Sequence, residues 1–175
     1  MEIVAAGPAD EALLLDLLNS TPVIEGVPHD QLDEPDTAQA WLTAHDVTLT
    51  GKALQELIEV RDALQAVVRG DLAPQALQPF LKGVELSPTI SDDGIAWTLS
   101  THRGCSAVAA QVILAWDALR ITSPGRLRPC ANSECRLFLI DRSKPNTARW
   151  CSMAICGNRM KARRHYQRSK TPNSL

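Results

Sequence analysis

The 175-residue sequence predicts an α+β protein in two parts: a mainly helical N-terminal domain with a small β-hairpin, then a treble-clef-like zinc finger built from a β-hairpin and a helix. Three observations lead to this expectation. Apolar residues recur with helical spacing through most of the first part, and between residues 84 and 100 they alternate as on a strand. Four of the five cysteines lie in the basic C-terminal part.

The N-terminal part predicts helices over 10–20, 36–45, 51–69 and 104–121, with a short helical segment at 74–82. The helix at 51–69 has the clearest apolar stripe, with Thr50 as the expected N-cap and Gly70 as the stop. Asp36 is expected to cap the helix at 36–45. Two alternating runs, 84–90 and 95–100, flank the turn sequence SDDG and predict a β-hairpin. Cys105 is expected to be a small buried thiol on the core face of the helix at 104–121.

The four clustered cysteines form two Cys-x4-Cys pairs, Cys130 with Cys135 and Cys151 with Cys156. Two short turns, each presenting two thiolates, suit one tetrahedral zinc ion. If all four bind, no position remains for a reactive water, so the zinc is expected to be structural. Two disulfides or four unrelated thiols are the alternatives. Nothing marks the chain as secreted, and reduced cytosolic thiols disfavour the disulfides.

The finger is expected to run through a strand at 136–140, a turn at 141–146 and a second strand at 147–150. Phe138 and Trp150 are expected to pack over the metal site. Ser152 would then cap a helix that begins at Met153 and ends near Lys170.

Charge divides the chain into an acidic part and a basic part. Residues 126–175 hold twelve basic and two acidic residues, a formal +10, so the first 125 residues carry −12. A dense, one-signed basic segment attached to a zinc module predicts binding of double-stranded DNA. A solvated charged face, or docking of the acidic domain on the basic one, are the alternatives. The expected DNA-contacting residues are Arg142, Lys144, Arg159, Lys161, Arg163, Arg164 and Arg168.

The C-terminal sequence resembles the CGNR-type zinc finger. The resemblance rests on RPCAN at 128–132, on Cys135, and on RWCSMAICGNRMKARRHY at 149–166. The upstream part resembles the ABATE domain, through LDLLNST at 15–21 and AWL at 40–42. The resemblance implies four cysteine zinc ligands and a bacterial, stress-induced transcription regulator. Ser123-Pro124-Gly125 breaks the chain where the charge reverses, which predicts a domain at 1–122, a linker at 123–125, a finger at 126–170 and a disordered tail at 171–175.

The helical domain is expected to sense a small-molecule effector or to form a homodimer. Asp16, Asn19 and Trp41 are the candidate pocket residues, although a solvated polar face would also explain the first two. An RNA- or protein-interaction zinc module is the alternative function. An enzyme is not expected, because no nucleophile–base pair or phosphate loop is present. No run reaches the length of a membrane span and no signal sequence is evident, so a cytoplasmic protein is expected.

Overall fold

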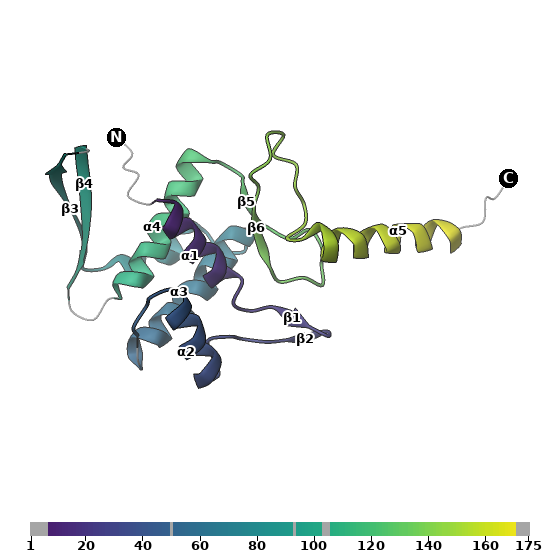
Figure 1. Ribbon diagram of the computed structural model, residues 1–175, viewed down its shortest axis with the longest axis horizontal. Helices are drawn as coiled ribbons and strands as arrows, with labels where there is room; N and C mark the ends of the chain where they lie inside the picture. Colours follow the sequence, from purple (N-terminus) through teal and green to yellow (C-terminus); the bar gives the residue numbers. More distant parts are fainter. Residues whose placement is uncertain (1–6, 50, 93, 103–105, 171–175) are drawn as a thin grey trace.

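The computed structural model describes residues 7–49, 51–92, 94–102 and 106–170 (Figure 1). Helices and three two-stranded antiparallel sheets make up the described chain. In chain order, the elements are α1 (Pro8–Leu18), β1 (Val23–Ile24), β2 (Val27–Pro28), α2 (Pro35–Ala44), α3 (Lys52–Arg69), a 3-10 helix (Pro74–Leu81), β3 (Val84–Ser91), β4 (Gly94–Thr101), α4 (Ala107–Thr122), β5 (Leu127–Pro129), β6 (Phe138–Ile140), a π-helical turn (Met153–Gly157) and α5 (Asn158–Lys170). The predicted α+β class is confirmed.

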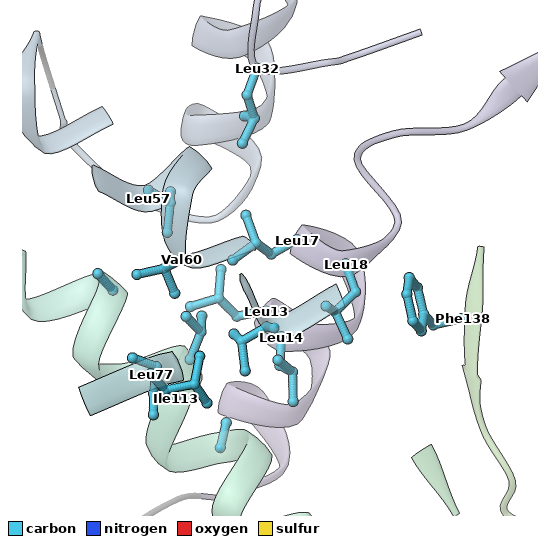
Figure 2. Packing of buried hydrophobic residues seen from close by; sticks show 14 of the residues in the cluster. Leu13, Leu14, Leu17, Leu18, Leu32, Leu57, Val60, Leu77, Ile113 and Phe138 are labelled. Atoms are coloured by element: carbon cyan, nitrogen blue, oxygen red, sulfur yellow. The ribbon is translucent and has the colours of Figure 1, made fainter. Parts of the chain in front are cut away.

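Helix α1 lies at the centre of the hydrophobic core. Leu14, Leu17 and Leu18 have no exposed side-chain surface, because apolar residues cover most of the circumference of this helix. Helices α3 and α4 pack on it, and the finger strand β6 closes another side. Figure 2 shows Phe138 of the finger facing Leu18 of α1.

Two helix starts differ from the predictions. Helix α2 begins at Pro35 after an extended N-cap, Glu34, so the predicted Asp36 cap is wrong. Proline favours this first position, because its fixed φ suits a helix and its missing N–H has no partner there. Helix α3 has Gly51 as its N-cap, and the predicted Thr50 lies outside the described residues, as does Cys105. The predicted stop at Gly70 is confirmed, with a left-handed φ of 86°.

The predicted hairpin at 84–100 is confirmed as β3 and β4, which pair in register from Val84↔Thr101 to Ser91↔Gly94. It stands out from the helical body at the end of the molecule opposite α5 (Figure 1). Its main contact with that body is through α4.

The finger hairpin differs from the prediction. Strand β6 pairs with β5, so the first cysteine pair lies in the loop between paired strands, and the predicted strand at 147–150 is wrong. The backbone there finds partners that are not a ladder. Ala148 N donates to the Asp141 carboxylate at 2.7 Å, and Arg149 O accepts from Ala131 N at 2.8 Å.

The finger is docked on the helical domain through Phe138. This side chain is 1% exposed and belongs to the helical core, so its predicted place over the metal is wrong. A module with few apolar residues of its own gains more by burying a large aromatic ring in a preformed core. Trp150 is half-buried.

Candidate metal centre and basic helix

The four predicted ligand cysteines converge. Their Sγ atoms all lie within 4.8 Å of one another, with Cys135 and Cys156 each 3.7 Å from Cys151. A tetrahedron with zinc–sulfur bonds of about 2.3 Å has sulfur–sulfur edges of about 3.8 Å. The donor set and spacing therefore fit one structural zinc ion. All four cysteines are free thiols, which does not support the disulfide alternative.

Local backbone geometry positions each pair of sulfurs. Cys130 N donates to Leu137 O at 2.8 Å and extends the β5–β6 ladder by one step, while Cys135 N closes a turn on Asn132 O at 2.8 Å. The second pair sits at a helix start. The predicted N-cap is confirmed, because the Ser152 hydroxyl accepts from Ile155 N at 3.3 Å. Cys156 thus lies in the first helical turn, where a helix favours negative charge.

Asn132 supports the site from inside and was missed by sequence reasoning. It has no exposed surface, and its Nδ2 donates to Cys156 Sγ at 3.5 Å. Burial raises the pKa of Cys156, but hydrogen bonds, led by the one from Asn132, lower it overall. Burial raises the pKa of Cys135 to about 11. Burial and the hydrogen bond with Cys156 raise the pKa of Cys151 further. Zinc must therefore displace thiol protons, which couples its binding to pH.

The residues after Cys156 join the metal turn to the basic helix. Gly157 is buried, and a Cβ there would come within 2.9 Å of Met153 Sδ and 3.3 Å of Trp150 Cδ1. Asn158 Nδ2 donates back to Ala154 O at 3.2 Å, and α5 continues from this junction. The Cys-Gly-Asn-Arg sequence is thus a compact joint between zinc site and helix.

Comparison with protein families agrees with this geometry. Residues 126–169 match the CGNR zinc finger. Residues 11–123, more than half of the chain, match ABATE, described as "Putative stress-induced transcription regulator". The chain belongs to the ABATE family. A search of curated proteins finds no match.

The predicted DNA-contacting cations of the CGNR finger fall into two groups, those with a salt bridge and those without one. Arg163 pairs with Glu134 of the finger, and Arg142 pairs with Glu11 of the ABATE domain. Of the α5 cations from Arg159 to Arg168, Arg163 is the one with a salt bridge among the described residues. The exposed cations of this stretch without a salt bridge are Arg159, Lys161, Arg164 and Arg168.

The loop that carries Arg142 and Lys144 is held by a buried carboxylate. Asp141 is 2% exposed and accepts from Ser143 Oγ at 2.6 Å, Ser143 N at 2.9 Å and Ala148 N at 2.7 Å. These bonds, led by that of the Ser143 hydroxyl, lower the pKa of Asp141. The loop therefore has a fixed shape that presents Lys144 to solvent.

The candidate pocket residues of the ABATE domain do not share one cavity. Asp16 is exposed and its carboxylate lies 3.6 Å from His45 Nε2, while the buried Trp41 ring is tilted against the same histidine with 4.4 Å between ring centroids. Asn19 is elsewhere, at the junction with the finger. Its Oδ1 accepts from Phe138 N at 2.7 Å and its Nδ2 donates to Phe138 O at 3.3 Å. The Asn19 side chain therefore pairs with the outer edge of β6 as a neighbouring strand would.

A polar network behind Asn19 fixes the end of α1. Arg61 is 2% exposed, holds Asp30 through two hydrogen bonds of 2.6 and 2.7 Å, and donates to Ser20 Oγ at 3.2 Å. Gln65 Nε2 donates to Leu18 O at 2.8 Å and to Thr21 Oγ1 at 2.9 Å. Sequence reasoning missed both partners on α3, and the signal was polar residues within that helix's apolar stripe.

The network reaches the CGNR finger through Arg69. One guanidinium nitrogen donates to Gln65 Oε1 at 3.3 Å and the other to Arg136 O at 3.0 Å. The guanidinium carbon lies 4.6 Å from the centroid of the Phe138 ring, within cation–π range. Asn19 and Arg69 thus fix the finger strand from two helices.

A groove of about 480 Å³ lies between the ABATE domain and the zinc site. Apolar side chains including Leu15, Val23, Leu137 and Ile155 line most of it, with Asn19 and Arg159 among its polar residues. Cys135, Cys151 and Cys156 also contribute to its wall. A molecule in this groove would touch both domains.

Among the described residues, no helix is long and apolar enough to cross a membrane.

Proposed function

We propose that this ABATE protein is a DNA-binding transcription regulator whose zinc ion anchors the basic helix α5. The observation that carries the proposal is the position of that helix. It leaves the zinc joint and extends away from the molecular body (Figure 1). A helix of 13 residues is about 20 Å long, and the DNA major groove admits one helix.

The cations without salt bridges define the DNA-contacting face. Lys161, Arg164 and Arg168 are spaced i, i+3 and i+7, so they form one stripe along α5. Arg163 is already paired with Glu134, and Arg159 lines the interdomain groove. We therefore expect the stripe, with Lys144, to make most phosphate contacts.

The test measures duplex affinity over a range of salt concentrations with zinc-loaded protein. Replacing Lys161, Arg164 and Arg168 together by alanine should remove about three phosphate contacts. The slope of log affinity against log salt concentration should then become shallower by about 3. The matched control removes Lys52, Lys82 and Arg120, three cations of the helical domain. Equal losses of duplex affinity in both triple variants would mean that net charge causes the effect. That result would overturn the proposed DNA-contacting face.

RNA binding by the finger is the alternative with a distinct physical requirement. Single-strand binders stack bases on exposed rings. Phe138 is 1% exposed and Trp150 is half-buried, which leaves Tyr166, at 60% exposed, as the accessible aromatic ring of the finger. This favours duplex DNA. Tighter binding to single-stranded RNA than to duplex DNA at equal salt would reverse that preference.

For the sensing role, we place the effector in the interdomain groove rather than beside Asp16 and Trp41. The groove has the size of a small-molecule site and mainly apolar walls. Methyl NMR with octanol and octanoate as probes should give shifts at Leu15, Val23 and Ile155. The variant Val23→Trp, which fills the groove, should abolish them. Shifts that persist in that variant would place the ligand elsewhere.

A further inference from the structure

The β3–β4 hairpin has one mainly apolar and one mainly polar face. Its register opposes Leu86 to Leu99, Pro88 to Trp97 and Ile90 to Ile95. Directly opposed residues in an antiparallel pair point to the same face, so these six side chains form one apolar ladder. The alternate pairs, Glu85 with Ser100, Ser87 with Thr98 and Thr89 with Ala96, form the other face.

The distal half of the apolar ladder is uncovered. Ile90 is 84% exposed and Ile95 is 63% exposed, whereas Leu86 and Leu99 nearer the body are half-buried. The hairpin projects away from the helices (Figure 1), and its main described contact with them is between β4 and α4. A two-stranded hairpin is only marginally stable in water without a third layer. A second layer over this ladder is therefore expected.

Charge limits what that layer can be. No ionisable side chain lies on the ladder, and the hairpin belongs to residues 1–125, which carry −12. Nucleic acid and anionic membranes are held by cations, and the ladder offers none. Pro88 also removes one backbone donor from β3, so a further strand cannot form a complete ladder on that edge. The uncovered surface is thus suited to packing face to face against an apolar protein surface.

We propose that the cover is the same ladder of a second copy of this chain. A two-fold axis in the plane of contact brings each ladder onto an identical one, so both apolar faces are buried by a single contact. The contact closes on itself and leaves the two basic helices free, because α5 lies at the opposite end of the molecule (Figure 1). Face-to-face packing of the two hairpins then forms a small two-layer β-sandwich.

The size of the ladder sets the strength of the dimer. Strands of eight residues are about 27 Å long and two of them are about 10 Å wide, and this whole face is the upper limit of the contact. A contact of this size is at or below the lower end of specific interfaces, about 1,000 Å² in total. We therefore expect a reversible dimer that dissociates in the micromolar range.

The test is sedimentation velocity of the full-length, zinc-loaded protein from about 1 to about 200 μM, without nucleic acid. The double variant Ile90→Glu/Ile95→Glu adds two charges to exposed ladder positions and should weaken the dimer at least about tenfold. Its matched control, Thr89→Glu/Ala96→Glu, adds the same charges at neighbouring exposed positions on the other face. The control should dimerise as the wild type does.

Two results would overturn the inference. One is a wild-type protein that stays monomeric throughout the concentration range. The other is equal weakening by both double variants, which would indicate charge repulsion or another interface. Because the experiment contains no DNA, its outcome is separate from that of the DNA-binding proposal.

Discussion

Removing the Asn19 amide should release the finger strand from the ABATE domain. The side chain makes two hydrogen bonds to the peptide groups of Phe138. Each neutral hydrogen bond contributes about 1 kcal/mol net, and water from the adjacent groove can replace part of this. Asn19→Ala should therefore lower the opening free energy of the Phe138 amide by about 1 to 2 kcal/mol. Alanine fits the backbone, because Asn19 has φ −93° and ψ 4°.

The assay is amide hydrogen exchange followed by NMR on zinc-loaded protein. A loss of about 1.4 kcal/mol corresponds to about tenfold faster exchange at Phe138. Asn19→Asp keeps the acceptor for Phe138 N–H but cannot donate to its carbonyl, so its effect on exchange should be smaller. Asp16→Ala, at an exposed position one turn earlier on α1, is the control and should leave this amide unchanged. If Asn19→Ala exchanges at the wild-type rate, the amide does not hold the strand.

Three further predictions concern the metal, the core and pH. Because zinc binding and finger folding are coupled, Cys151→Ser or chelation of zinc should abolish the near-ultraviolet circular dichroism of Trp150. The α1–α3–α4 core should keep its helical signal. An unchanged near-ultraviolet signal from Trp150 would contradict this coupling. Phe138→Ala should cost about 3 to 5 kcal/mol in urea unfolding, since its buried ring joins the core, and a cost below about 1 kcal/mol would place the ring outside it. Burial raises the pKa of Asp30, but the hydrogen bond and charge of Arg61 lower it overall. The stabilisation of the fold by the Asp30–Arg61 pair is therefore present above about pH 4. It is lost as pH falls through the lower pKa that Asp30 has in the folded state. Asp30→Asn should cost about 2 kcal/mol at pH 7, and a difference from wild type that persists in strong acid would contradict the pair's role.

The sequence by itself determined the elements whose signals are local. Two equal cysteine spacings predicted the metal ligands, and the four sulfurs do converge. The Ser152 cap, the Gly70 stop and the hairpin around SDDG are each decided by a few neighbouring residues, and all three are confirmed. The direction of charge segregation also follows from the sequence alone.

Only the tertiary structure decided how the two domains meet, because those contacts join residues far apart in the chain. Phe138 looked like a cover for the metal, yet the C-terminal end of the leucine-rich helix α1 offers it a larger apolar surface. Asn19 looked like a pocket residue, yet it lies opposite the free edge of β6 and pairs with it. The strand expected at 147–150 does not form, since a buried carboxylate at Asp141 satisfies the backbone that a ladder would need. Local patterns set the parts, and long-range burial and hydrogen bonding set their arrangement.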